Sequence, residues 1–282
     1  MRVTTLIENR PSEDDPHLKA EWGLSLHISY NGHSILFDTG SSGSFAANAE
    51  RLSVDIASVD SAVLSHHHFD HGGGLARFLE LNPTAEVHLG EAPHGDPICR
   101  ILGFVKKYIG LDKALVAGHP DRFLTLSEPT EILPGVFLLP HIAGPHPKPG
   151  GNRQLLLRTD DGLAPDEFAH EIVMAIVEDG ELVIFTGCSH NGVLNMVDTV
   201  ARQFDGVPIK AVIGGLHLVA APPLNRMAGT RQEVENLARA VLDYPIGMTY
   251  TGHCTGAKAF GVLQSVMGNR LADLRTGSCF EA

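Results

Sequence analysis

Short hydrophobic runs alternate with turn residues and polar clusters along the whole chain. In the first third these runs are rich in Val, Ile and Leu and are bounded by polar residues, which favours β-strands. Asn31 and Gly32 lie between two such runs, and Asn-Gly is the strongest short signal for a β-hairpin. The strands predicted in this part are Val3–Ile7, Leu24–Tyr30, Ser34–Phe37, Ser61–Leu64 and Glu86–Leu89.

Helical spacing of apolar residues predicts helices between and after these strands. The predicted helices are Phe45–Leu52, Gly74–Leu81, Pro97–Ile109, Val193–Phe204, Arg231–Leu242 and Ala257–Val266. Further strands are predicted at Glu171–Val177, Leu182–Phe185, Ile209–Ile213 and Met248–Tyr250. Strands that alternate with helices are typical of an α/β protein.

Residues 140–152 interrupt this pattern with four Pro and three Gly residues. Such a composition predicts a loop, which is either the one linker of the chain or a loop over a site.

Polar clusters follow the strands in both halves of the sequence. They begin at Asp38, His66, Gly187, Gly214 and Gly252. One architecture explains this pattern: two mixed β-sheets face each other, helices flank them, and the strand ends form a site along one edge. We therefore expect a single α/β domain over residues 1–282, built as a four-layer αββα sandwich.

Charge and composition limit the partners. The chain has 282 residues, a net charge of −12 and 43% hydrophobic residues. The negative charge disfavours nucleic acid and anionic membranes, because both bind basic surfaces, so we expect a small-molecule substrate. The four Cys residues form no C-x-x-C pair, and no signal peptide or membrane span is evident in the sequence, which predicts a cytoplasmic protein with reduced thiols.

The 16 His residues are unevenly distributed, and four potential metal ligands follow the strand Ser61–Leu64. His66, His68, Asp70 and His71 form the pattern H-x-H-x-D-H. Imidazole and carboxylate groups bind divalent ions such as zinc, and a short loop can direct the first two residues at one ion and the last two at a second. This spacing predicts a metal site rather than a His-rich polar surface.

With this motif, the chain resembles the metallo-β-lactamase superfamily, whose defining pattern is H-x-H-x-D-H after a strand. Asp38 and the Thr186-Gly187-Cys188 segment are similar to the first and fourth motifs of that superfamily. The segments Ala20–Ser25, Thr186–His190, Gly214–Leu218 and His253–Gly256 are similar to its dihydropteroate-synthase-like branch, which includes methanopterin-precursor synthases. Trp22 departs from this branch, which tends to have His at that position.

The resemblance implies a centre of two metal ions. Its predicted ligands are His66, His68, Asp70, His71, Cys188, His190 and His253. Asp70 is also the predicted catalytic residue, because it would orient the water. The superfamily's usual Gly-His-Thr segment before the fourth motif is absent, so His190 is the preferred third ligand of the first ion and His170 the alternative.

Four other residues lie in or near these motifs, and the sequence suggests a role for each. Cys188 is either a thiolate ligand or a small buried hydrophobe, and Cys254 is expected to point away from the site as a structural residue. His217 either faces the substrate or is buried, and Glu21 either contacts the substrate or is a strand-edge carboxylate. We expect His217 and Glu21 to bind substrate.

The functional hypothesis is a metal-dependent hydrolase that cleaves a small-molecule ester, lactone, amide or phosphoester with a dinuclear metal-bound hydroxide. The expected cofactors are two divalent ions, with Zn²⁺ favoured and Mn²⁺, Fe²⁺ or Mg²⁺ as alternatives. One competing hypothesis is a dihydropterin-type condensing transferase, and another is a non-catalytic small-molecule binder. The oligomeric state stays open.

Overall fold

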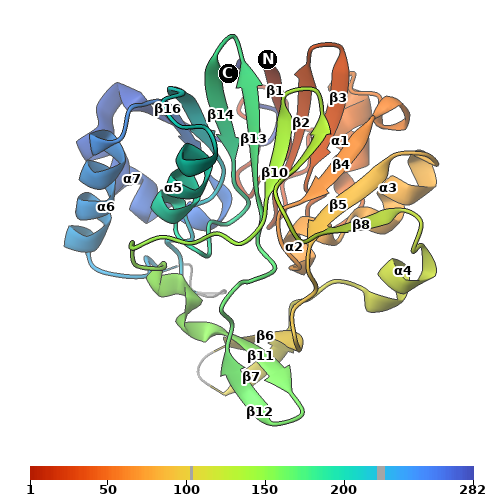
Figure 1. Cartoon of the computed structure of the whole chain (residues 1–282), viewed down its shortest axis with the longest axis horizontal. Coiled ribbons are helices and arrows are strands. Elements are labelled where there is room, and N and C mark those ends of the chain that lie inside the picture. Colours follow the sequence, from red (N-terminus) through yellow and green to blue (C-terminus); the bar gives the residue numbers. More distant parts are fainter. Residues whose placement is uncertain (102–103, 221–225) are drawn as a thin grey trace. The chain divides into compact units, whose positions relative to one another are not determined.

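The computed structural model describes residues 1–101, 104–220 and 226–282, and it divides into two compact units (Figure 1). Unit 1 consists of Met1–Ala92, Gly110–Ser127 and Leu274–Ala282, and unit 2 of Pro93–Ile109 and Glu128–Asp273. Residues 140–152 lie inside unit 2, so they are a loop and not a linker. The single-domain assignment stays a prediction.

Unit 1 contains a seven-stranded mixed sheet in the order β18-β1-β2-β3-β4-β5-β8. Its strands are β1 (Arg2–Ile7), β2 (Ser25–Tyr30), β3 (His33–Phe37), β4 (Ser61–Leu64), β5 (Glu86–Gly90), β8 (Phe123–Leu126) and β18 (Cys279–Glu281). The β2–β3 hairpin turns at Asn31 and Gly32, whose φ angles of 47° and 81° are the positive values that this turn requires. From β3 to β8 the neighbouring strands are parallel, so the ends of β3 and β4 lie side by side.

Helices α1 (Ser44–Arg51) and α3 (Leu75–Leu81) pack on the sheet of unit 1, as their apolar spacing predicts. Phe45 and Phe78 of these helices are fully buried in one core with Leu36 and Val87 of the strands. The unit also contains the short helices α2 (Phe69–Gly72) and α4 (Lys113–Gly118) and a 3₁₀ turn at Ile56–Ser58.

Unit 2 contains a second seven-stranded mixed sheet, in the order β17-β16-β15-β14-β13-β10-β9. Its strands are β9 (Thr130–Leu133), β10 (Val136–Leu139), β13 (Val173–Glu178), β14 (Glu181–Phe185), β15 (Ile209–Ile213), β16 (Ile246–Thr251) and β17 (Leu271–Asp273). β14, β15 and β16 are parallel neighbours, so the loops that follow them lie at one edge of the sheet.

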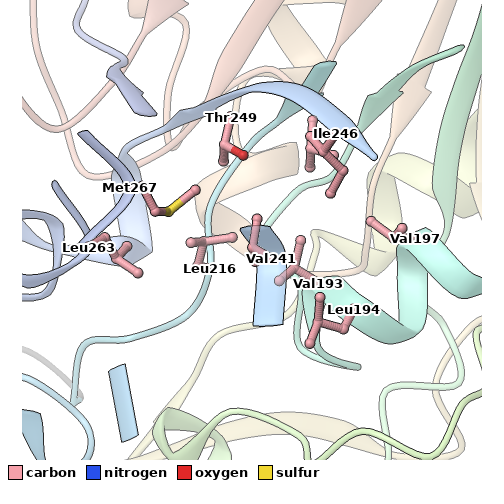
Figure 2. Close-up of a pocket in the computed structure, with 10 residues that line it drawn as sticks. Val193, Leu194, Val197, Leu216, Val241, Ile246, Thr249, Leu263 and Met267 are labelled. Carbon is pink, nitrogen blue, oxygen red and sulfur yellow. The ribbon is translucent and has the colours of Figure 1, made fainter. Parts of the chain in front are cut away.

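Helices α5 (Val193–Gln203), α6 (Arg231–Asp243) and α7 (Ala257–Met267) share one apolar core with this sheet. Short 3₁₀ turns cover Gly150–Gln154, His253–Thr255 and Gly268–Arg270. A cavity of about 10 Å³ lies in this core. Figure 2 shows side chains that line it, such as Val197, Leu216 and Met267. Its lining is almost entirely apolar, so it is a packing gap and not a binding site.

A third sheet in unit 2 corrects one sequence prediction. Pro97–Ile109 is not a helix: β6 (Asp96–Ile101) and β7 (Val105–Tyr108) form an antiparallel pair there, and residues 102–103 lie outside the described residues. β6 also pairs with β11 (Leu155–Thr159), which pairs with β12 (Gly162–Pro165). Pairing with a strand far along the chain outweighs local helical spacing, which is a weak preference.

Across the three described ranges, every helix is too short or too polar to cross a membrane.

Candidate metal centre

The side chain of Asp38 organises the end of β3 and β4 in unit 1. Its Oδ1 accepts a hydrogen bond from the backbone N–H of Ser65 (2.8 Å), and its Oδ2 accepts one from Ser65 Oγ (2.8 Å). The same Oδ2 lies 2.6 Å from Nδ1 of His71, and both side chains are fully buried. Because a carboxylate only accepts hydrogen bonds, Nδ1 of His71 carries the proton, and Nε2 is the nitrogen suited to binding a metal.

The rings of His66, His68 and His71 converge beside this pair. Nε2 of His66 lies 3.0 Å from Nδ1 of His68, and the ring centroids of His66 and His71 are 4.2 Å apart. Ser65 Oγ also lies 2.9 Å from Nδ1 of His66. Three buried imidazoles at this spacing fit a divalent ion in their chemistry, and the hydrogen bond between Asp38 and His71 fixes the orientation of one of them.

Trp22, which departs from the pattern of the dihydropteroate-synthase-like branch, forms a hydrogen bond with Asp70. Nε1 of Trp22 donates a hydrogen bond to Oδ2 of Asp70 (2.9 Å), and the backbone N–H of Leu24 donates to the Asp70 carbonyl (3.2 Å). Trp22 therefore orients the predicted catalytic carboxylate, a role that the sequence did not suggest.

Both carboxylate oxygens of Glu21 are engaged within unit 1. Oε1 accepts hydrogen bonds from the backbone N–H groups of Ser41 and Ser42 (2.9 Å each), and Oε2 accepts one from Ser42 Oγ (2.6 Å). These bonds give Glu21 a structural role in the loop after β3. Its contact with substrate stays a prediction.

Three loops of unit 2 carry the remaining predicted ligands, one after each of β14, β15 and β16. In each loop one residue other than glycine has a left-handed backbone: Ser189, His217 and His253 have φ angles of 61°, 47° and 48°. Such conformations each cost of order 1–3 kcal/mol and persist only where the surroundings enforce them. Strain at three adjacent strand ends is typical of a functional site.

His190 is fixed from several sides within unit 2. Its Nδ1 lies 2.9 Å from Oδ1 of Asn152, whose Nδ2 donates back to the His190 carbonyl (2.8 Å). The ring stacks on Phe168 with centroids 4.2 Å apart and planes within 2° of parallel. Since the amide oxygen of Asn152 only accepts, Nε2 of His190 is the nitrogen suited to a metal.

Glu171 holds the backbone of the His190 loop. Its Oε1 accepts from the His190 N–H (2.7 Å), and its Oε2 accepts from the N–H and the side-chain amide of Asn191 (2.7 and 2.9 Å). Complete burial raises the pKa of Glu171, and the hydrogen bonds from Asn191 and His190 only partly offset that rise. Sequence reasoning missed both Glu171 and Asn152, because neither lies in a motif and each acts from far along the chain.

Cys188 is shared by two groups of possible metal donors in unit 2. The donor atoms of Cys188, His190 and His217 lie within 4.8 Å of one another, and so do those of Cys188, His253 and Cys254. This places Cys188 in a donor cluster, as its thiolate interpretation expects. Both ring nitrogens of His217 are buried, with no hydrogen-bond partner among the described residues.

The expectation that Cys254 points away from the site is wrong. Its Sγ lies with the Cys188 and His253 donor atoms and accepts a hydrogen bond from the backbone N–H of His217 (3.3 Å). Burial raises the pKa of the Cys254 thiol, but contacts with Cys188 and His217 and the nearby His253 outweigh it and hold the pKa well below its usual value.

His170, the alternative third ligand, pairs with a buried carboxylate. It lies before β13, not in it, and its Nε2 is 3.2 Å from Oδ2 of Asp166, with both side chains buried. His190 shares a donor group with Cys188 inside unit 2, and His170 belongs to another group of possible donors with Asp166, so the preference for His190 stays a prediction. The ligand assignments and the number of ions stay predictions.

Comparison with known proteins identifies the relatives of this chain. The family profile described as the metallo-beta-lactamase superfamily matches residues 24–253. A curated protein of Methanocaldococcus jannaschii, named 7,8-dihydropterin-6-methyl-4-(β-D-ribofuranosyl)-aminobenzene-5'-phosphate synthase, is 28% identical over 275 residues, which cover 92% of this chain and 89% of that protein.

Solved structures show the same fold. Tm1679, described as a metal-dependent hydrolase of the β-lactamase superfamily, superposes with a TM-score of 0.80 at 25% identity, covering 100% of this chain and 99% of that one. Zn²⁺-bound PqqB from Methylobacterium extorquens superposes with a TM-score of 0.61 at 13% identity over 100% of both chains. The expected fold class is confirmed.

Proposed function

Because the chain belongs to the metallo-β-lactamase superfamily, we propose that it is a metal-dependent hydrolase of a small-molecule ester, lactone, amide or phosphoester. The observation that carries the proposal is the buried 2.6 Å pair of Asp38 and His71 beside the converging rings of His66 and His68. Carboxylate-oriented imidazoles are the usual surroundings of a catalytic metal.

The donor sets of both units fit divalent ions. His66, His68, Asp70 and His71 in unit 1, and Cys188, His190 and His253 in unit 2, would hold them. Two bound divalent ions lower the pKa of water towards neutrality and so supply a nucleophile for hydrolysis at neutral pH.

Asp70 is the proposed general base for the attacking water. Trp22 donates a hydrogen bond to Oδ2 of Asp70, and the carboxylate held in this way would accept a proton from the attacking water. The hydrogen bond from Trp22 restricts rotation of this carboxylate. His217, whose buried ring nitrogens lie in the loop after β15, is the proposed substrate contact.

A second candidate function is the synthesis that the M. jannaschii relative is named for. Identity of 28% over 92% of this chain favours it. That reaction would join a dihydropterin to an aminobenzene ribose phosphate. It is a transfer rather than a hydrolysis, although it would use the same His-rich shell.

One experiment separates these candidates. The full chain, reconstituted with Zn²⁺, Mn²⁺ or Mg²⁺, is assayed against lactones, phosphodiesters, phosphomonoesters and β-lactams, with the pterin condensation run in parallel. Hydrolysis that falls about 10²- to 10⁴-fold in Asp70→Asn, with Asp60→Asn as the surface control, supports the first function. Condensation without hydrolysis supports the second, and metal content near zero after reconstitution contradicts both and favours a binder.

A further inference from the structure

Two thiols converge at the edge of the sheet in unit 2. Cys188 follows β14 and Cys254 follows β16, and the Sγ atoms of both lie within 4.8 Å of each other and of a ring nitrogen of His253. All three side chains are buried. Ligands of a tetrahedral zinc ion are about 3–4 Å apart, given bonds of about 2.0–2.3 Å, so small side-chain rotations would close these three donors on one ion.

The neighbouring loop is shaped around the sulfur of Cys254. A Cβ atom at Gly215 would lie 2.4 Å from this Sγ, so any larger residue there would displace it. The backbone N–H of His217 donates to the same Sγ (3.3 Å), and those of Leu218 and Val219 donate to the Cys254 carbonyl (2.9 and 3.1 Å). The loop after β15 therefore holds Cys254 in place from two sides.

The backbone at His253 gives independent support. Its φ angle of 48° is left-handed, a conformation that costs free energy in a residue other than glycine. This strained residue directs its own imidazole and the next residue's thiol into the same donor group. The left-handed residue therefore lies where these two side chains converge with Cys188.

We propose that Cys254 is a second thiolate ligand, which together with Cys188 and His253 gives unit 2 an S₂N donor set for a thiophilic divalent ion such as Zn²⁺. The inference rests on the proposed metal-dependent function and adds the identity of the ion. Two thiolates and an imidazole are a soft set that favours Zn²⁺ over Mg²⁺, which prefers oxygen ligands. On binding, each thiol would exchange its proton for a metal–sulfur bond, and both protons would pass to solvent without any redox change.

Cobalt substitution tests this ligand set without using activity. The reduced full chain is loaded with Co²⁺ under anaerobic conditions, and the near-ultraviolet sulfur-to-cobalt charge-transfer band is recorded. In Cys254→Ser the band should fall by about half, because one of two sulfur–cobalt bonds is lost, and in the Cys188→Ser/Cys254→Ser double variant it should vanish. Cys279→Ser and Cys99→Ser are matched controls, since these residues lie in β18 and β6 and should leave the band unchanged.

Two further measurements do not depend on the folding of Cys254→Ser. In Gly215→Ala the added Cβ should push the Cys254 sulfur away and weaken the band while all four thiols remain. X-ray absorption of wild-type protein with two bound zinc ions should give one sulfur per zinc on average if both thiolates are ligands, and half a sulfur if only Cys188 is one.

The outcomes distinguish this inference from the proposed function. A full band in folded Cys254→Ser, half a sulfur per zinc, or no cobalt binding at all would overturn the inference. A Cys254-dependent band in a protein that turns over none of the tested substrates would support the inference and contradict the hydrolase. Hydrolysis with a Cys254-independent band would do the reverse.

Discussion

The indole Nε1 of Trp22 donates a 2.9 Å hydrogen bond to Oδ2 of Asp70, 48 residues later in the sequence. The superfamily branch that the chain resembles tends to have His at position 22, and Trp22 departs from that pattern. In this chain Trp22 supplies an N–H donor at this position. The indole presents one donor and no acceptor, so it can only hold the carboxylate and cannot bind a metal itself.

Replacement of Trp22 by Phe should weaken the metal site. The variant removes the N–H but keeps an aromatic ring, so Asp70 loses its orienting hydrogen bond while the packing is largely preserved. Loss of an outer-shell partner typically costs about 10- to 100-fold in metal affinity or activity. Zinc titration measures the effect, and Trp22→His, which restores an N–H, should recover part of it. Equal affinity in Trp22→Phe and wild type would show that Trp22 does not support the site.

Replacement of Asp38 by Asn should weaken metal binding in unit 1 through His71. The buried pair at 2.6 Å would lose its charge, and Nδ1 of His71 would no longer be held as the donor to a carboxylate. We expect metal affinity to fall by about 10- to 100-fold. Asp55→Asn, in the exposed cap of a 3₁₀ turn, is the control. Circular dichroism separates loss of metal from loss of fold, and unchanged affinity in a folded Asp38→Asn would contradict the prediction.

Replacement of His190 should lower metal affinity, whereas replacement of His170 should lower the stability of the fold. His190→Ala removes a predicted ligand and should reduce metal affinity by at least about 10-fold. His170→Ala should retain the metal but lower the free energy of unfolding by about 1–3 kcal/mol, because the buried Asp166 carboxylate loses a partner. Metal titration and urea denaturation of both variants make the comparison. The opposite result would transfer the ligand role to His170.

Tyr244 should give the stability of unit 2 a dependence on alkaline pH. Burial and the hydrogen bond to Asp198 (2.8 Å) raise the pKa of Tyr244 to about 12, and its hydroxyl also contacts His146 in the loop over residues 140–152. A pKa above the unfolded value of about 10 means that the stabilisation is complete below pH ~10 and is lost as the pH rises towards 12.

The measurement compares wild type with Tyr244→Phe. The difference between their free energies of unfolding should be constant up to pH ~10 and should shrink above it. In a titration followed by tyrosinate absorbance, the folded wild type should show an ionisation near pH 12 that is absent from folded Tyr244→Phe. A constant difference across the alkaline range would mean that Tyr244 ionises normally in the folded chain.

Local sequence was enough to predict most strands and helices of this protein and the candidate metal donors of unit 1. Runs such as Ser61–Leu64 contain apolar residues on both faces, and the ligands of H-x-H-x-D-H lie within six residues, so their geometry is set by one strand end and one short turn. The Asn31-Gly32 turn was predictable for the same reason, because two residues with positive φ angles fix it.

Tertiary structure decided every feature that depends on residues far apart in the chain. The segment Pro97–Ile109 pairs as strands because β11 lies beside β6, although its local spacing resembled a helix. Asn152 and Glu171 position His190, and Trp22 positions Asp70, across separations of 38, 19 and 48 residues. Side-chain periodicity records only which face of an element a residue occupies, so it contains no signal for such partners.

The side-chain direction of Cys254 also could not be predicted from the sequence. Its position next to His253 suggested opposite directions, as in an extended strand, where neighbouring side chains alternate. The chain instead forms a 3₁₀ turn with a left-handed residue at this point, and both side chains join one donor group with Cys188. The sequence determined that these donors exist, and the parallel pairing of β14, β15 and β16 determined that they meet, because only that pairing brings the three loops to one edge of the sheet.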